Sequence, residues 1–226
     1  MVHSFTAILL EKKMLTEDIL YFSLSCPEEF SFEAGQFVTF FLTQEGKQKP
    51  RSYSILNPPS RKGKLEFITK LIPGGLASEF LEKAKLGDPL PVKGPLGHLL
   101  LQPAQEHWFI ATGTGVVPFY SMLAEHLPRL PDQKFNLLLG LAEQKDIFLQ
   151  QELELLQKNY TSFTYVIALS REAWSGARGR VQEHLPADLG NKMFYLCGRQ
   201  EMVVEMRAHL LAQGVPVEKI KLESYG

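Results

Sequence analysis

Short segments that alternate apolar and polar residues fill the first hundred positions, and many of their apolar residues are β-branched or aromatic. Such segments, separated by turn-forming residues, are typical of β-strands. The pattern predicts one short helix over residues 76–84 and strands over residues 5–11, 19–25, 36–42, 51–56 and 65–71. Strands at this spacing, with little helix between them, indicate a closed or nearly closed antiparallel β-barrel.

After residue 102 the pattern changes, and short apolar runs alternate with segments of helical periodicity. The expected strands are 108–111, 136–140, 163–168, 193–196 and 220–222, and the expected helices are 116–126, 148–158, 180–185 and 201–213. This alternation favours a doubly wound parallel sheet covered on both faces. We therefore predict two domains, an antiparallel Greek-key barrel of residues 1–102 and an α/β domain of residues 103–226.

The composition excludes several classes of protein. With 24 basic and 25 acidic side chains the formal net charge is −1, which gives no general attraction to nucleic acid. Two distant cysteines and six scattered histidines indicate neither an iron–sulfur nor a zinc site, so no metal is expected. No apolar run approaches the ~20 residues of a membrane helix. Since no secretory signal opens the chain, we expect a cytoplasmic protein without membrane contact.

A glycine-rich turn, Gly113-Thr114-Gly115-Val116-Val117-Pro118, follows the first strand of the second half and opens a helix. Glycines let a diphosphate approach the backbone closely, and the N–H groups of a helix start attract anions. The turn therefore suits a dinucleotide, although tight strand-to-helix turns favour glycine for structural reasons as well.

A second motif, Arg51-Ser52-Tyr53-Ser54, falls on a predicted barrel strand. Alternation places Arg51 and Tyr53 on one face and the two serines on the other. An arginine fork can bind a diphosphate, a tyrosine can stack on a planar ring, and a serine can hydrogen-bond a ring nitrogen. The alternative is an ordinary edge strand with an aromatic side chain and a solvated arginine.

Several motifs follow one another in a fixed order along the chain. They are residues 32–37 (FEAGQF), 51–54 (RSYS), 75–78 (GLAS), 94–97 (GPLG), 113–118 (GTGVVP), 195–198 (YLCG) and 223–226 (ESYG). This succession resembles the ferredoxin–NADP(+) reductase family, in particular its compact bacterial branch, over essentially the whole chain. The resemblance implies a flavoenzyme in which an FAD-binding barrel precedes a domain that binds a nicotinamide dinucleotide.

The resemblance also implies roles for the matching residues. Arg51 would bind the FAD pyrophosphate, Tyr53 would stack on the isoalloxazine ring, and Ser54 would hydrogen-bond near flavin N5. The turn over residues 75–78 would donate hydrogen bonds to the diphosphate. The implied FAD contacts are Arg51, Ser52, Tyr53, Ser54, Ile68, Lys70, Gly75, Leu76, Ala77, Ser78, Thr114 and Tyr225.

Hydride transfer is assigned in the same way. The implied contacts of the nicotinamide dinucleotide are Gly113, Thr114, Gly115, Ser170, Arg171, Arg180, Cys197 and Gly198. Cys197 is expected to act by position, because a lone cysteine is most often a small buried apolar residue. Tyr225 would cover the flavin face that nicotinamide must reach, with Glu223 as a nearby polar or proton-handling group. The catalytic set is thus Ser54, Cys197, Glu223 and Tyr225.

Relatives often end in one more aromatic residue where this chain has Gly226. The resemblance therefore does not extend to stacking of the last residue on the FAD adenine.

Ser170, Arg171 and Arg180 favour NADPH over NADH, because they match the phosphate contacts of the NADP-linked bacterial reductases. A 2′-phosphate attracts arginines, whereas an NAD site more often presents an acid to the ribose. A further arginine that is common in these relatives is replaced by the stretch 140–142, and three arginines in a loop are often only solvated charges. NADH therefore remains an alternative.

Seven basic residues and one acid, Glu66, lie between Lys47 and Lys70. A basic face around a flavin would steer a small acidic carrier such as ferredoxin or flavodoxin. The alternative explanation is a charged hairpin that is simply solvated.

The resemblance implies hydride transfer from nicotinamide C4 to flavin N5 and single-electron transfer to the carrier, or the reverse. Three alternatives remain open: an NADH-dependent reductase component that feeds an oxygenase, a free-flavin reductase, and a non-catalytic flavin or nucleotide sensor or docking subunit.

Overall fold

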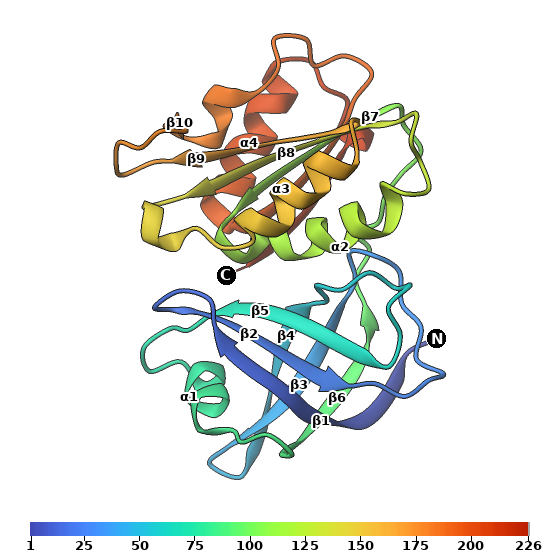
Figure 1. Cartoon of the computed structure of the whole chain (residues 1–226), viewed down its shortest axis with the longest axis vertical. Helices are drawn as coiled ribbons and strands as arrows, with labels where there is room; N and C mark the ends of the chain where they lie inside the picture. The colour runs from blue at the N-terminus through green and yellow to red at the C-terminus, as the bar shows by residue number, and fades with distance from the viewer. Residues whose placement is uncertain (226) are drawn as a thin grey trace.

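The computed structural model describes residues 1–225 and contains two six-stranded β-sheets, one above the other in Figure 1. The first sheet is antiparallel, with the strand order β4-β3-β6-β1-β2-β5. Its strands are β1 (His3–Met14), β2 (Ile19–Ser25), β3 (Phe37–Gln44), β4 (Lys47–Ser54), β5 (Lys64–Lys70) and β6 (Pro89–Leu96). The edge strands β4 and β5 approach each other without forming a ladder over residues 1–225. The sheet is therefore the nearly closed barrel that the pattern predicts.

The barrel interior is filled by aromatic rings. Phe22 stacks on Phe67 at 5.0 Å between ring centroids, and Phe40 meets Phe67 edge-on at 5.2 Å. From edge strand β5 the chain returns through α1 (Leu76–Lys83) to β6 in the middle of the sheet, which is a Greek-key connection. Lys12 of β1 donates to the carbonyls of Leu81 and Ala84, which fixes the carboxyl end of α1 on the barrel.

Strand β6 is absent from the sequence-based expectation, because three prolines interrupt its apolar pattern. Pro89 and Pro91 pair with β1, while β3 pairs only with β6 residues 92–96. The two prolines thus lie where β6 has a single hydrogen-bonded neighbour, so their missing N–H groups break no ladder. The predicted strand 51–56 is also shifted, since β4 ends at Ser54.

The second sheet is parallel, with the order β10-β9-β8-β7-β11-β12. Its strands are β7 (Glu106–Thr112), β8 (Lys134–Leu141), β9 (Phe163–Leu169), β10 (Ala177–Arg178), β11 (Met193–Arg199) and β12 (Ile220–Tyr225). The chain runs from β7 outward through β8 to β9 and then crosses to β11 on the other side of β7. The strand order therefore reverses between β7 and β11, which is where sheets of this kind bind ligands.

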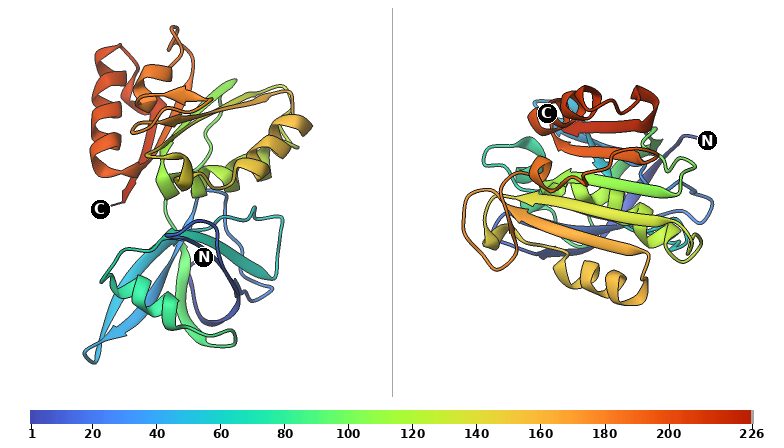
Figure 2. Two further views of the ribbon diagram at one scale, coloured as in Figure 1. Left: turned by 60° about the vertical axis from the view of Figure 1, so that its left-hand side comes forward. Right: turned by 90° about the horizontal axis from the view of Figure 1, so that it is seen from above.

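Helices cover both faces of this sheet (Figure 2). Helices α2 (Val116–His126) and α3 (Gln150–Asn159) share one apolar core with the inner face, and α4 (Gln200–Ala212) shares another with the outer face. The doubly wound architecture is confirmed. The predicted helix 180–185 is wrong in type, because these residues form only the 3₁₀ turn η3 (Val181–His184). Gly179 enters that turn with a φ of 93°, and Leu185, which precedes Pro186, is extended.

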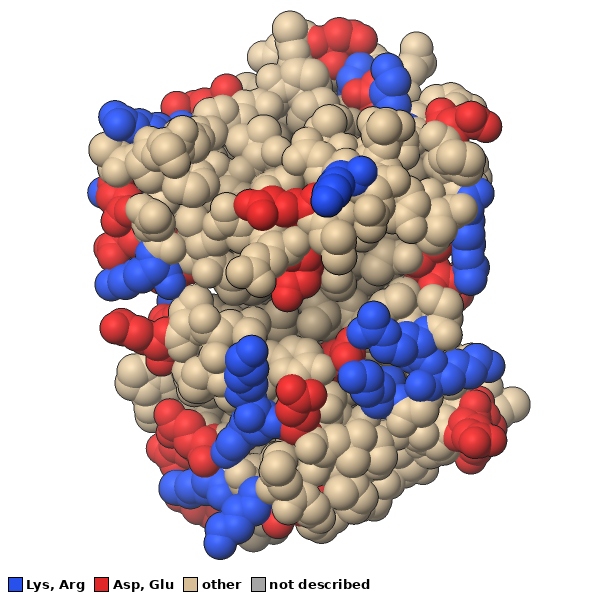
Figure 3. Space-filling view, viewed as in Figure 1, with Lys and Arg blue, Asp and Glu red and all other residues tan. Residues whose placement is uncertain are grey.

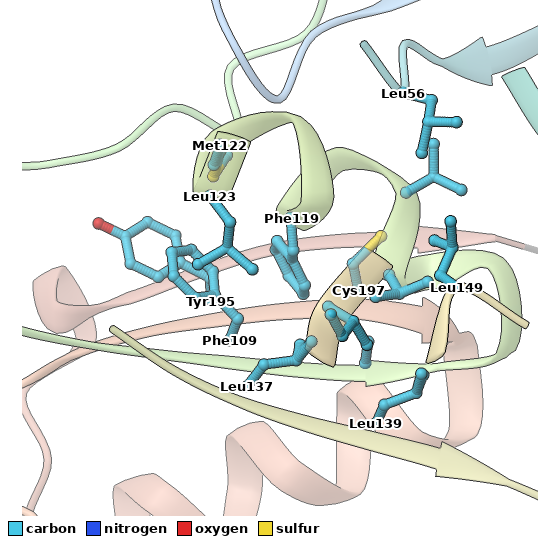
Figure 4. Close-up of a cluster of buried hydrophobic side chains, with 14 of the residues drawn as sticks. Leu56, Phe109, Phe119, Met122, Leu123, Leu137, Leu139, Leu149, Tyr195 and Cys197 are labelled. Carbon is cyan, nitrogen blue, oxygen red and sulfur yellow. The ribbon is translucent and has the colours of Figure 1, made fainter. Parts of the chain in front are cut away.

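The two sheets share a hydrophobic core. Leu56 of the barrel side belongs to the same cluster of buried side chains as Phe119 and Met122 of α2 (Figure 4). Two polar contacts hold α2 to the loop after β4: the Ser121 hydroxyl donates to the carbonyl of Asn57 at 2.8 Å, and the amide of Ser60 donates to the Glu125 carboxylate at 3.1 Å. The shared core fixes how the barrel faces the carboxyl ends of the parallel strands.

Candidate active site

The four residues expected to be catalytic come from three strands and meet at one place. Ser54 is the last residue of β4, and its hydroxyl lies 2.8 Å from the hydroxyl of Tyr225 at the end of β12. The other two residues lie close to this pair of hydroxyls, the Cys197 thiol beside Tyr225 and the Glu223 carboxyl beside Ser54. The parallel register that pairs Cys197 with Glu223 and Arg199 with Tyr225 brings the end of β12 to the barrel.

Burial sets the protonation of this cluster. Cys197 is 0% exposed and packs among the side chains of Figure 4. Burial raises the pKa of the Cys197 thiol well above its ordinary value, so the sulfur stays protonated rather than acting as a thiolate nucleophile. Burial also raises the pKa of the Glu223 carboxyl, an effect that the Ser54 hydroxyl partly offsets. The pKa of the Tyr225 phenol is raised as well, chiefly by burial.

The motif on β4 faces the open edge of the barrel. The register pairs Tyr53 with Val38 and Arg51 with Phe40, which confirms that these two side chains share one face of the strand. The half-buried Tyr53 ring stacks on Phe40 at 5.0 Å, and its phenol lies close to Thr69 of β5. On the other face the Ser52 hydroxyl is engaged with Thr39 at 3.0 Å.

The start of α1 forms a tight turn. The Gly75 amide donates to the Ile72 carbonyl at 2.9 Å, and the Ile72 amide donates to the Ser78 hydroxyl oxygen at 2.7 Å. Leu76 and Ala77 pack against the barrel core, so only their backbone groups face away from it. Gly75 caps the helix without a side-chain hydrogen bond, which leaves first-turn N–H groups for an anion.

These features fit FAD. Arg51 is exposed, and over residues 1–225 it enters no ion pair. Arg51 and the start of α1 are the donors that a diphosphate needs. The ring of Tyr53 lies beside the unladdered edge of β5, where backbone groups can bind the polar rim of a planar ring. The side chain of Ile68 is buried in the shared core, so this residue offers only its backbone.

A cavity of about 420 Å³ opens at the carboxyl ends of β7, β8, β9 and β11. Tyr225 and Lys70 form part of its wall, so the cavity borders both the hydroxyl cluster and the barrel. Lys70 is paired with Asp18 at 2.6 Å. The expected nucleotide contacts that line the cavity are Gly113, Thr114, Ser170, Arg171 and Arg180.

Two glycines permit the close approach of β7 and β11 at this point. A Cβ on Gly115 would collide with the Cys197 carbonyl, and one on Gly198 would collide with Thr112. Gly113 differs, because its φ of 55° is left-handed while the space around it is open. Gly115 and Gly198 thus bring the turn after β7 against the end of β11, and Gly113 leaves room for a ligand.

The loop after β9 carries the arginines predicted for the 2′-phosphate. The amides of Ser170 and Arg171 donate to the carbonyls of Leu141 and Ala142 at 3.0 Å, which continues the sheet into the cavity wall. The Trp174 indole donates to the Ala177 carbonyl at 2.6 Å and braces the loop. These donors and the open cavity fit a nicotinamide dinucleotide.

Sequence reasoning missed several charged residues of the cavity wall, namely Asp146, Arg199, Glu201 and Glu205. Arg199 follows Gly198 directly, and its amide donates to the Thr112 hydroxyl at 3.2 Å. Glu205 pairs with Arg180 at 3.0 Å. Position in the sequence could have indicated Arg199 and the two glutamates. Arg199 is the last residue of β11, and the first turns of α4 directly follow this strand, which ends where the strand order of the sheet reverses.

Part of the basic run between Lys47 and Lys70 is neutralised by a neighbouring acid. Arg61 and Lys64 both pair with Glu66, at 3.0 and 2.6 Å. The face in Figure 3 shows Lys and Arg side chains in separate groups interspersed with Asp and Glu. Strand pairing also separates the run, since the turn that joins β3 to β4 lies at the end of the barrel remote from the second sheet (Figure 1).

Two family models match the chain. An oxidoreductase FAD-binding domain covers residues 6–100, and an oxidoreductase NAD-binding domain covers residues 109–208. A ferredoxin–NADP reductase B of Sorangium cellulosum is 33% identical over 91% of this chain and 90% of its own length. The chain therefore belongs to the ferredoxin–NADP reductase family of flavin-dependent oxidoreductases, which use FAD and a nicotinamide dinucleotide.

Two further proteins show the breadth of the likeness. The phenol 2-monooxygenase reductase component DmpP of a Pseudomonas species is 31% identical over 76% of this chain, which spans 51% of that component. The crystal structure of a ferredoxin NADP+ reductase from Neisseria gonorrhoeae with bound FAD and NADP superposes with a TM-score of 0.87. The match covers 98% of both chains at 24% identity and confirms the fold.

Among the described residues no helix has the length and apolar character needed to span a membrane. Gly226 lies outside the described residues.

Proposed function

We propose that this chain exchanges hydride between NADPH and FAD, and single electrons with a small acidic carrier such as ferredoxin or flavodoxin. The observation that carries the proposal is the position of Tyr225, which lines the 420 Å³ cavity while its hydroxyl lies 2.8 Å from Ser54 on β4. We assign the FAD-binding domain to residues 1–102, the nucleotide-binding domain to residues 103–226, and the reaction to the cytoplasm.

The residues of the cluster have distinct tasks. FAD, when bound, supplies the conversion between two-electron and one-electron chemistry. Tyr53 offers a ring face, Ser54 offers a hydroxyl for a polar ring atom, and Tyr225 covers the site and excludes water. Cys197 stays a neutral thiol and keeps the base of the site apolar. Glu223 has a raised pKa, so it can hold a proton beside Ser54.

Arg171 and Arg180 support the choice of NADPH. Both line the cavity with Ser170, and a 2′-phosphate is the part of NADPH that needs them. Arg171 enters no ion pair within residues 1–225, so its guanidinium is available to an anion without prior separation of a pair.

A second groove of about 540 Å³ supports the carrier step. It lies between the barrel and β12, with Phe37, Leu96, Leu222 and Glu223 in its wall. Two members of the cluster thus face different openings: Glu223 lines this groove, while Tyr225 borders the nucleotide cavity. We propose that the nucleotide and the carrier use these separate openings. Lys221 in the groove wall offers a positive charge to an acidic partner.

One observation favours a second candidate, an NADH-dependent reductase component that feeds an oxygenase. Arg180 is already paired with Glu205, which lowers its value for a 2′-phosphate. The similarity to a phenol monooxygenase reductase component is compatible with this alternative.

The test is an anaerobic titration of the FAD-loaded protein with NADPH and, separately, with NADH, followed by the visible absorbance of the oxidised flavin. Bleaching by NADPH at much lower concentration supports the proposal. Preference for NADH would replace it by the oxygenase-reductase alternative. Loss of FAD on gel filtration would favour a free-flavin reductase. Stopped-flow oxidation of the reduced protein by ferredoxin and flavodoxin then tests the carrier, and oxidation by neither would refute that step.

A further inference from the structure

The nucleotide cavity carries acids as well as bases. Four cations and three anions line it: Lys70, Arg171, Arg180 and Arg199 against Asp146, Glu201 and Glu205. The acids repel any phosphate group that enters the cavity. Their positions therefore influence which nucleotide binds more tightly. Among them Glu205 forms an ion pair with an arginine of the cavity.

The pair between Arg180 and Glu205 crosses from the loop after β10 to the outer helix. Arg180 Nη1 lies 3.0 Å from Glu205 Oε2, and the two side chains are 69% and 54% exposed. The Arg180 backbone is held separately, since its amide donates to the Glu183 carboxylate at 2.9 Å. The side chain of Arg180 therefore has one charged partner in the described structure, and that partner faces the cavity.

We propose that Glu205 is a specificity-determining residue that opposes the 2′-phosphate by occupying Arg180. The inference rests on the proposed binding of NADPH in this cavity. A 2′-phosphate must compete with the Glu205 carboxylate for the guanidinium and is repelled by it, whereas a ribose hydroxyl carries no charge and can donate a hydrogen bond to the carboxylate. Glu205 thus narrows the preference for NADPH and preserves use of NADH.

Helix α4 offers a matched comparison. Glu201 and Glu205 are four residues apart on one face of α4, and both line the cavity. Glu201 forms no ion pair with Arg180, because the partner of that arginine is Glu205. Neutralising Glu201 removes the same charge from the same face, so it should favour every anionic nucleotide to a similar degree.

The experiment uses calorimetry on the FAD-loaded protein with 2′,5′-ADP and 5′-AMP as probes, since they differ only in the 2′-phosphate. In Glu205→Gln we expect 2′,5′-ADP to bind about fivefold more tightly, the size of effect of an exposed ion pair, while 5′-AMP binding is unchanged or weaker. In Glu201→Gln the ratio of the two dissociation constants should change less than about twofold. An unchanged ratio in Glu205→Gln, or equal tightening of both probes, would overturn the inference.

A second background shows whether Glu205 acts through Arg180. In Arg180→Gln most of the effect of Glu205→Gln should vanish, and a full effect there would also overturn the proposal. Failure of the underlying function is separately visible. If the wild-type protein binds 2′,5′-ADP no better than 5′-AMP, its NADPH preference fails, while the shift of the ratio in Glu205→Gln still decides the role of Glu205.

Discussion

Glu223 is a half-buried carboxyl group whose pKa is raised above the ordinary value of 4.5, mainly by burial. The folded state therefore binds this proton more tightly than the unfolded state. The resulting stability is full below pH 4.5 and is lost as the pH rises through the folded pKa. Glu223→Gln keeps the neutral shape without a titration. We expect the variant to melt at a higher temperature than wild type at neutral pH, and the difference to shrink toward acid pH.

Exposed Glu28 supplies the control for this measurement. Thermal melts of Glu28→Gln across the same pH range should run parallel to those of the wild-type protein. If the Glu223→Gln and wild-type melts also stay parallel, the carboxyl is not held in its neutral form. Glu223 would then be a poor candidate for holding a proton in the cluster.

Tyr225 covers the end of the cavity and is held by Ser54 at 2.8 Å. In the proposed function nicotinamide displaces this ring, and a nucleotide anchored by its 2′-phosphate does so more readily than one without it. Tyr225→Ser removes the cover, so kcat/KM for NADH should rise more than kcat/KM for NADPH. The ratio of kcat/KM for NADPH to kcat/KM for NADH should therefore fall about tenfold. Tyr225→Phe keeps the ring and should keep the ratio. Steady-state kinetics with both nucleotides check this, and an unchanged ratio in Tyr225→Ser would refute the covering role.

The elements β7, α2 and β11 meet where the strand order reverses, and Gly115 sets how closely they approach. Gly115 has a φ of −60°, so alanine fits its backbone, but a Cβ would strike the Cys197 carbonyl. We expect Gly115→Ala to lower the free energy of unfolding by about 2–3 kcal/mol, as overpacking does, and to weaken NADP+ binding. Urea unfolding and calorimetry measure the two effects.

Gly113 in the same turn provides the contrasting control. Its φ is left-handed at 55°, but the space around it is open. Gly113→Ala should therefore cost only the backbone strain, about 1–2 kcal/mol. A larger loss in Gly113→Ala than in Gly115→Ala would show that backbone conformation, rather than close packing, limits this turn.

The strands and helices that follow a single local pattern could be predicted, and those that depend on distant pairing could not. Strand β2 and helix α2 occur at the predicted residues 19–25 and 116–126. Strand β6 could not be recognised, because Pro89 and Pro91 are acceptable only where β3 stops pairing with it. The motif order supplied Ser54 and Tyr225, which the structure places in contact. Glu205 remained unrecognised, because a glutamate on a helix looks solvated until the fold brings Arg180 beside it.

Across the whole molecule, the barrel and the parallel sheet share a core and do not merely touch. Ile19, Leu56 and Leu99 from the barrel side pack in the same cluster as Phe119 and Met122 of α2. Such shared burial of apolar surface couples the two halves, so opening the interface exposes the cores of both. The site lies on this junction, and its geometry therefore depends on the stability of the entire chain.

Asn57 tests this coupling, because it is 0% exposed and ties the interface loop together. Its side chain donates to the carbonyls of Arg61 and Lys64 and accepts from the amide of Glu66. Asn57→Ala leaves these groups unpaired and should lower the free energy of unfolding by about 2–3 kcal/mol. Both tryptophans lie in the second half, so their fluorescence reports the parallel sheet, while release of FAD reports the barrel.

In one cooperative unit, Asn57→Ala should lower the midpoints of both signals by the same amount, even though the substituted residue lies on the barrel side. Ser121→Ala, which removes one hydrogen bond across the interface, should shift both by less, about 1 kcal/mol. A barrel signal that shifts while the tryptophan signal stays would show two independent units. In that case the hydroxyl cluster of Ser54 and Tyr225 would be held by its own contacts, because the shared core would contribute little to keeping β4 and β12 together.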